Sequence, residues 1–72
     1  MRLFIYPSDI EIIVGCSKQH AEKLHRDIRE ALGKIIRDKD KKILKKQPLT
    51  INEYCSYNGI KKEEVISVLK LV

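Results

Sequence analysis

The chain has 72 residues, of which 43% are hydrophobic and 35% are charged, and its formal net charge is +5. A chain of this length holds one small domain, and its apolar fraction excludes a disordered tail. No apolar run reaches the roughly 18 residues that a membrane-spanning helix needs, so we expect no membrane partner. Two cysteines outside any CxxC pair, with no secretory signal before them, predict a reduced protein in the cytoplasm.

The basic charge is unevenly distributed along the chain. Residues 1–46 carry 12 Lys and Arg against 7 Asp and Glu, whereas residues 47–72 carry 3 of each kind. The segment 34–46 alone has 7 basic and 2 acidic residues. A basic half beside a neutral half predicts one face for a polyanion and another for folding or partners. The simpler alternative is a solvated helix face.

The first residues predict an arm followed by a short helix. Residues 2–6 (RLFIY) are apolar and aromatic, and they could form an edge strand or pack as an N-terminal arm. Pro7 suits the first position of a helix, and Asp9 can cap its free N–H groups. Gly15 is suited to a left-handed C-cap, so we expect a helix over residues 7–14.

A longer amphipathic helix is predicted next. Ser17 is a favourable N-cap, and Gly33 is expected to disturb the helix near its end. The segment 35–46 is ambiguous: its apolar pairs could belong to a continued or separate helix, whereas the run RDKDKK between them could be a loop. The apolar positions at steps of three and four are Ala21, Leu24, Ile28, Ala31, Leu32 and Ile35.

Two further helices are predicted after Pro48, which ends whatever precedes it. Thr50 and Glu53 have the spacing of a capping box, in which each residue satisfies a free N–H group of the other. The dipeptide Asn58-Gly59 then indicates a turn. The expected helices cover residues 51–57 and about 62–71.

The two halves of the sequence share a pattern centred on Gly15 and Gly59. Each half has a short capped helix, a glycine turn and a second helix, which is the layout of a helix-turn-helix unit. Aligning the glycines pairs Cys16 with Ile60, Ala21 with Val65, and Leu24 with Val68. We expect these residues to pack the helices together, with both Cys16 and Cys55 as small buried apolar residues.

The predicted fold is therefore mostly all-α. We expect a small helical bundle with an N-terminal helix-turn-helix, a second helix-turn-helix-like pair, and a short strand or arm at the N-terminus. A single small domain would cover residues 1–72. Its parts would be a DNA-reading helix-turn-helix at 7–33, a basic connector at 34–48 and a C-terminal helix pair at 49–72.

The predicted second helices of the two units differ in charge. The first opens with Ser17, Lys18 and Gln19, and the free N–H groups and cations there suit phosphate. Glutamine can bond adenine, and Lys or Arg can bond guanine. The helix after Gly59 has Glu63 and Glu64 in its first turn, which repel phosphate. The first unit is therefore the better candidate for contacting nucleic acid.

The first unit resembles the helix-turn-helix DNA-binding family, and more narrowly the small excisionase-like regulators of bacterial mobile elements. The resemblance covers roughly residues 7–32. Glu11 departs from it, because the family usually has alanine four residues before this glycine, and a shift of register by one residue would be one consequence. The residues that carry the resemblance are Asp9, Ile10, Val14, Gly15, Cys16, Ser17, Ala21, Leu24, Arg26 and Ile28. The resemblance implies that the helix from Lys18 enters the major groove with Ser17, Lys18, Gln19, Glu22, Lys23 and Arg26 facing DNA.

The resulting hypothesis is sequence-specific binding of double-stranded DNA, as a transcriptional regulator or an excisionase-like architectural factor. Gln19 and Lys23 would contact bases, and phosphates would be bound by Lys18, Lys23, Arg26, Arg29 and the segment 34–46. That segment would be a wing-like or helical element on the DNA backbone, or else a solvated linker. Because one unit has a small footprint, we expect a homodimer or a neighbouring partner protein.

The alternative hypothesis is a helical protein–protein interaction adaptor that uses the C-terminal helix pair, with its apolar tail 65–72 and the Tyr54 and Tyr57 face. No catalytic group or cofactor motif is identified, so we expect no enzyme activity and no cofactor. His20 and His25 are five residues apart, so one helix face does not hold both for a metal ion. We therefore predict no metal site.

Overall fold

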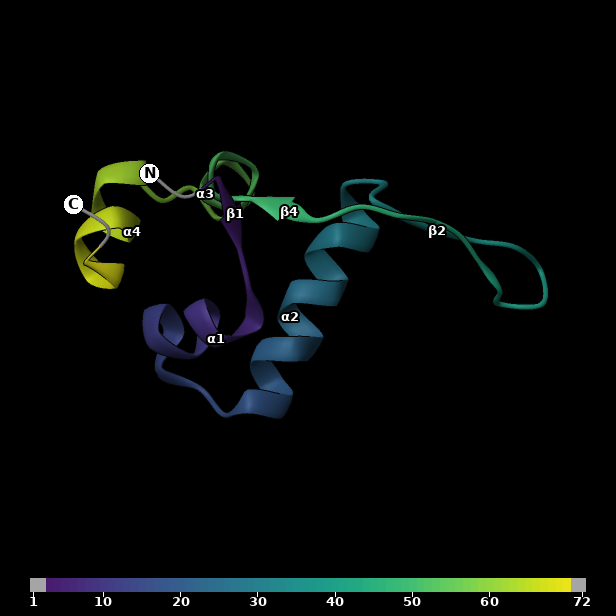
Figure 1. The fold of residues 1–72 in the computed structure, drawn as a ribbon, viewed down its shortest axis with the longest axis horizontal. Coiled ribbons are helices and arrows are strands. Elements are labelled where there is room, and N and C mark those ends of the chain that lie inside the picture. Colours follow the sequence, from purple (N-terminus) through teal and green to yellow (C-terminus); the bar gives the residue numbers. More distant parts are fainter. Residues whose placement is uncertain (1–2, 71–72) are drawn as a thin grey trace.

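A computed structural model of the chain describes residues 3–70 and combines helices with strands (Figure 1). Arg2 and Leu71, which were included in two predicted elements, lie outside the described residues. In chain order the elements are β1 (Phe4–Ile5), α1 (Pro7–Ile10), a π-helical turn η1 (Glu11–Gly15), α2 (Lys18–Ala31), β2 (Ile35–Arg37), β3 (Ile43–Lys46), β4 (Leu49–Thr50), α3 (Ile51–Asn58) and α4 (Lys62–Leu69).

The prediction of a mostly all-α bundle is wrong. Within residues 3–70, four α-helices accompany two antiparallel two-stranded sheets, and the fold is mixed α/β with 57% helix. The first sheet pairs Phe4 with Thr50 and Ile5 with Leu49, so the N-terminal residues form a strand that lies beside the segment before α3. The second sheet is the β2–β3 hairpin, which extends away from the helices (Figure 1).

The hairpin occupies the segment that was expected to be a helix or a loop. At its tip, Oδ1 of Asp38 accepts the N–H groups of Asp40 at 2.9 Å and Lys42 at 2.8 Å. Lys41 takes a left-handed conformation with φ of 64°. Aspartate side chains that bond nearby N–H groups favour turns over helices. The Asp-rich run therefore forms a turn, and the isoleucines on either side form the strands.

The predicted helix over 7–14 is divided into α1 and the π-helical turn η1. Asp9 caps its beginning, since its Oδ2 accepts the N–H of Tyr6 at 2.8 Å. A π turn holds one more residue than an α turn. Ile10 is fully buried, whereas Ile12 is 61% exposed and Glu11 is half-buried. The π turn therefore changes which side chains face the core after Ile10.

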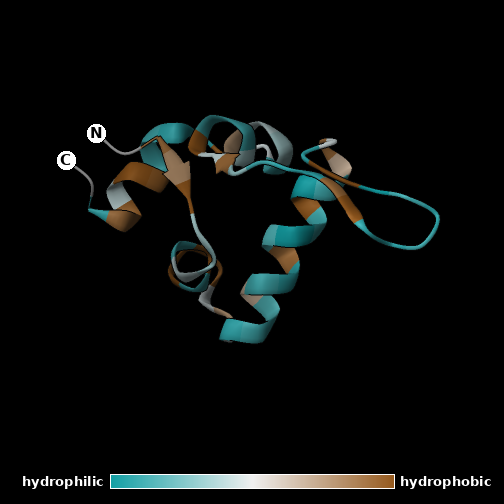
Figure 2. Ribbon diagram, turned by 45° about the vertical axis from the view of Figure 1, so that its right-hand side comes forward, coloured by the Kyte–Doolittle hydropathy of each residue, from teal (hydrophilic) through white to brown (hydrophobic). Residues whose placement is uncertain are grey.

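A single apolar core joins the N-terminal and C-terminal parts of the chain. Figure 2 shows α2 banded in brown and teal, as a helix with one apolar and one polar face should be. Cys55 is buried and Cys16 is half-buried, and both thiols are free. The buried core residues are Ile5, Ile10, Ala21, Ile28, Leu49, Ile51, Tyr54, Cys55 and Val65.

The predicted capping box at the start of α3 is confirmed, and a lysine extends it. The Glu53 N–H donates to Oγ1 of Thr50 at 3.1 Å, and the Thr50 N–H donates to Oε1 of Glu53 at 3.0 Å. Nζ of Lys34 lies 2.8 Å from the same Oε1. Lys34 follows Gly33, whose φ of 72° ends α2. The network therefore ties the end of α2 to the beginning of α3.

Replacing Glu53 with glutamine should reduce the acid sensitivity of folding. The Lys34 ammonium lowers the pKa of Glu53, with a smaller opposing effect of burial and further lowering by the Thr50 bonds. A carboxylate with a lowered pKa stabilises the fold fully above its unfolded pKa, and this contribution is lost as pH falls through the folded value. Denaturant unfolding at pH 7 and pH 3 should show a smaller loss for Glu53→Gln than for the wild type. An equal loss would contradict the role of this network.

Candidate nucleic-acid interface

The structure places every predicted DNA-contacting residue on α2 or at its N-cap. Ser17 is the N-cap, and its hydroxyl accepts the His20 N–H at 3.3 Å. Six of the side chains are exposed and Arg29 is half-buried. The set is Ser17, Lys18, Gln19, Glu22, Lys23, Arg26 and Arg29. At about 100° per residue, the six positions within α2 share one side of the helix, opposite the buried Ala21 and Ile28, whereas Ser17 precedes the helix as its N-cap.

The orientation of α2 is fixed by a buried histidine as well as by apolar packing. His25 is 7% exposed, and its Nε2–H donates to the carbonyl oxygen of Ile5 at 3.0 Å. Ile5 belongs to β1, which pairs with β4. The polar side of α2 therefore faces outward because its opposite side is bonded and packed to the first sheet. His25 is a structural residue, and its hydrogen bond satisfies a strand carbonyl.

His25 should make the fold less stable as pH falls below neutrality. Burial lowers the pKa of His25; the bond to Ile5 and the charge of Asp9 raise it, and the charge of Arg29 lowers it. A histidine whose pKa is lowered in the folded state binds more protons when unfolded, so its stabilisation is complete above about pH 6.5 and is lost as pH falls through the folded pKa.

The matching variant is His25→Gln, whose amide retains a donor but does not titrate in this range. We expect it to cost about 1 kcal/mol at pH 7. Chemical denaturation at pH 7.5 and pH 5 should show that the wild type loses more stability than the variant between these values. If both proteins lose the same amount, then His25 is not the group responsible.

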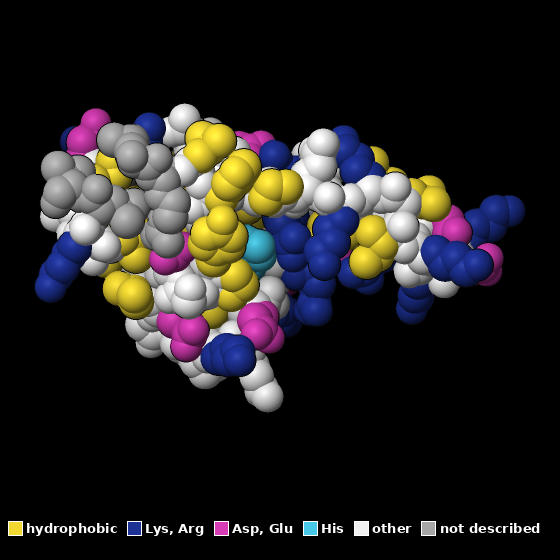
Figure 3. All heavy atoms as spheres, in the orientation of Figure 1, with side chains coloured by type: hydrophobic (Ala, Val, Ile, Leu, Met, Phe, Trp, Pro, Cys, Tyr) yellow, Lys and Arg dark blue, Asp and Glu magenta, His cyan; other side chains and the backbone are white. Residues whose placement is uncertain are grey.

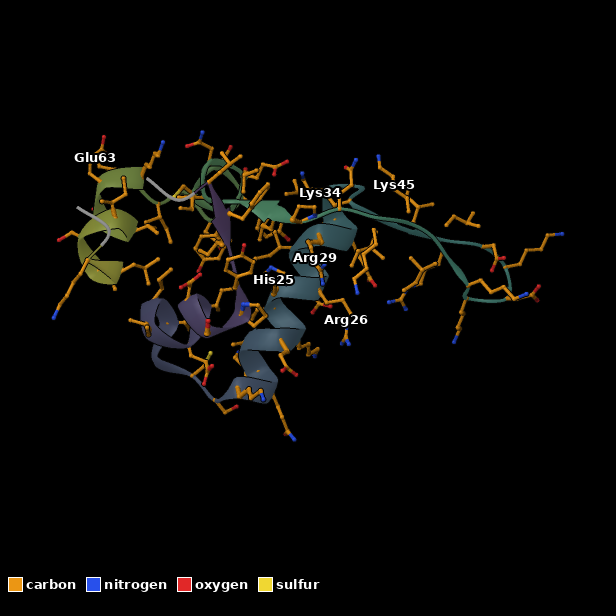
Figure 4. All side chains as sticks on the ribbon, in the orientation of Figure 1. His25, Arg26, Arg29, Lys34, Lys45 and Glu63 are labelled. Atoms are coloured by element: carbon orange, nitrogen blue, oxygen red, sulfur yellow. The ribbon has the colours of Figure 1, made fainter. Side chains whose placement is uncertain are left out.

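Two neighbouring arginines, Arg26 and Arg29, place two repelling positive charges on this side of α2. Figure 4 shows Arg26 and Arg29 on α2, with Arg26 pointing away from α1. Burial lowers the pKa of Arg29, and the charge of Arg26 lowers it further, while Glu30 raises it. Among the described residues, Nε of Arg29 is buried without a hydrogen-bond partner. An anion placed beside Arg26 and Arg29 would relieve the repulsion between their charges.

The hairpin continues the basic surface beyond the end of α2. A guanidinium nitrogen of Arg37 lies 3.3 Å from Oε1 of Glu30, so an ion pair connects strand β2 to helix α2. Ile35 is buried, whereas every residue of β3 is exposed. In Figure 3 the dark blue side chains gather beside α2 and along the hairpin. The exposed lysines of this arm are Lys39, Lys41, Lys42, Lys45 and Lys46.

Lys34 does not belong to this surface, although the sequence included it among the phosphate-binding cations. Its side chain is 16% exposed and paired with Glu53. Conversely, no sequence pattern predicts the Arg37–Glu30 pair, because this pair depends on a strand lying beside a helix. The signal that could have revealed the hairpin is the pair of isoleucine-rich segments around the Asp-containing turn.

Other kinds of site receive no support from the part of the chain that is described. Residues 3–70 contain no group of three His, Cys, Asp or Glu side chains that could hold a metal ion. The described helices are all too short or too polar to cross a bilayer. The candidate site is the side of α2 that bears Lys18, Lys23 and Arg26, together with the adjoining hairpin. The chain was compared with family models, curated proteins and solved structures, and none of them matches it.

Proposed function

We propose that the chain binds double-stranded DNA, with α2 in the major groove and the β2–β3 hairpin beside it. The observation that supports this most directly is the gathering of exposed Lys and Arg side chains on one side of α2 and along the adjoining hairpin, with Glu22 and Glu30 among them on α2. An α-helix fits the major groove, and an adjacent basic arm adds contacts to the phosphates. In this proposal, α1, η1 and α2 act as a helix-turn-helix and the hairpin acts as a wing.

Individual roles follow from side-chain chemistry and position. Gln19 and Lys23 would contact base edges, since glutamine pairs with adenine and lysine with guanine. Glu22 would accept a hydrogen bond from a cytosine amino group.

Arg26 and Arg29 would bind a phosphate between them. Lys18, in the first turn of α2 after its Ser17 cap, would bind a second phosphate with the help of free N–H groups.

The biological role proposed is transcriptional regulation, or architectural assistance in moving a mobile element. The 14 residues of α2 span only about 21 Å at 1.5 Å per residue, so a single chain would contact few base pairs. Useful specificity would therefore need a second copy or a neighbouring protein on the DNA. The free thiols of Cys16 and Cys55 suit the reducing cytoplasm.

The direct test is fluorescence anisotropy of a labelled generic duplex titrated with the purified chain at several salt concentrations. If about five phosphates are neutralised, log K should fall with log salt at a slope of about −4 to −5. Absence of binding at low salt and micromolar protein would overturn the proposal. If the duplex is bound, selection from a random duplex library will identify the preferred sequence.

An adaptor function is the second candidate, and a hollow beside α4 favours it. This hollow has a volume of about 250 Å³ and is lined by residues of η1 and α4, including Ile13 and Val68. Val68 is 48% exposed, but Tyr54 is buried and cannot form part of a docking face. Because Leu69 packs against the core, Val68→Asp is the better variant for testing this surface. It should leave DNA binding unchanged.

A further inference from the structure

Two large apolar side chains are exposed in succession on the hairpin. Ile43 is 51% exposed and Leu44 is 67% exposed, although both lie within strand β3. Single exposed apolar residues are common on protein surfaces. Here, however, the two adjacent exposed residues lie on an arm that extends from the rest of the molecule (Figure 1). They form an apolar patch at a position where a partner can reach it.

A β-bulge separates Leu44 from the regular pairing of the hairpin. Ile36 lies opposite Lys45 and Arg37 lies opposite Ile43, so Leu44 is the extra residue without a cross-strand neighbour. Bulges bend a strand and redirect a side chain, and they are typically functional features. The bulge therefore changes the geometry of the strand where its apolar residues are exposed.

The position of Ile43 can be deduced from its cross-strand neighbour. Residues directly opposite each other share a face of a hairpin. Arg37, opposite Ile43, reaches Glu30 of α2. Ile43 is therefore on the face of the hairpin that is turned toward α2. The hairpin and the helix can accordingly contact the same ligand.

The charges around the patch select the kind of partner. Lys42 precedes the apolar pair and Lys45 and Lys46 follow it, and residues 41–46 include no acidic side chain. A second copy of this hairpin would bring like charges together, which is unfavourable. A polyanion with an apolar interior fits both properties, because the phosphates of DNA would pair with the lysines while stacked bases would receive the apolar side chains.

We propose that Ile43 and Leu44 enter the minor groove and wedge between base pairs, so that the protein bends the duplex it binds. The proposal rests on the DNA-binding function proposed above. The hairpin begins just after α2 and extends away from it (Figure 1), so the arm can reach a minor groove while α2 occupies the neighbouring major groove. Apolar wedges of this kind unstack a base step and kink DNA toward the major groove.

The test is the distance between donor and acceptor dyes at the two ends of a short duplex, measured by energy transfer at saturating protein. The wild type should bring the ends closer together. The double variant Ile43→Ala with Leu44→Ala should lose most of that change and bind about tenfold more weakly, because the wedge is truncated. Its fold should persist, since both side chains are exposed, and circular dichroism with thermal melting checks this.

The matched control replaces another exposed apolar pair, Ile12→Ala with Val14→Ala, which should bend DNA like the wild type. Salt-dependent binding without any change in end-to-end distance would overturn the wedge alone and leave the DNA-binding function standing. Full bending by the hairpin variant would also overturn it. A wild-type dimer that this variant dissociates, measured by sedimentation, would assign the patch to a second copy instead. Absence of any duplex binding would overturn both proposals.

Discussion

Replacing Lys23 and Arg26 with glutamate is expected to weaken duplex binding strongly while the fold survives. Both side chains are exposed on the outer side of α2 and neither belongs to the core. Loss of two cationic contacts, together with repulsion from the new carboxylates, should weaken binding by about 100- to 1000-fold at moderate salt. Anisotropy titrations measure this effect, and thermal melting should show little change in stability.

The control for this experiment has the same change of net charge in the C-terminal part of the chain. Lys61 and Lys70 are exposed at the two ends of α4. The double variant Lys61→Glu with Lys70→Glu should retain most of the affinity, because these residues lie outside the proposed interface. If both double variants weaken binding equally, then attraction depends on net charge alone and α2 is not the contacting helix.

Replacing Ile10 with alanine is expected to unfold a large fraction of the protein. Ile10 is 0% exposed and belongs to the core that joins both parts of the chain. Truncating a buried isoleucine costs about 2–5 kcal/mol, which is a large part of the stability of a domain this small. Ile12→Ala makes the same chemical change two residues later, where the side chain is 61% exposed, and should cost less than about 0.5 kcal/mol. Equal costs in denaturant unfolding would contradict the register of η1.

The features that sequence reasoning predicted correctly are local ones. The Thr50–Glu53 box and the Ser17 cap depend on side chains that bond N–H groups three residues away. Gly15 and Gly59 do adopt positive φ, as the predicted turns required. The grouping of Lys18, Glu22 and Arg26 on one side of a helix likewise depends only on helical periodicity. Interactions within one or two turns are encoded in the spacing of the residues.

The features that sequence reasoning missed depend on contacts between residues that are distant in the sequence. Pairing of Phe4 with Thr50 joins residues far apart in sequence, and neither strand has more than two residues. A strand this short has no periodicity to detect. The Lys34–Glu53 pair is equally non-local, which is why sequence reasoning placed a half-buried, paired lysine among the phosphate-binding cations. For residues 35–46, strong helix formers and strand-forming isoleucines gave opposing signals, and the turn at Asp38 decided the outcome.

The pairing of β1 with β4 also has a consequence for synthesis on the ribosome. Ile5 and Ile28 leave the ribosome long before Leu49 and Val65, yet all four belong to one core. At translation speeds of about 5–20 residues per second, the apolar side of α2 is uncovered for on the order of seconds. A nascent chain that stops after the hairpin would have the complete basic helix without the residues that fold it. Such truncated products would be substrates for chaperones and proteases.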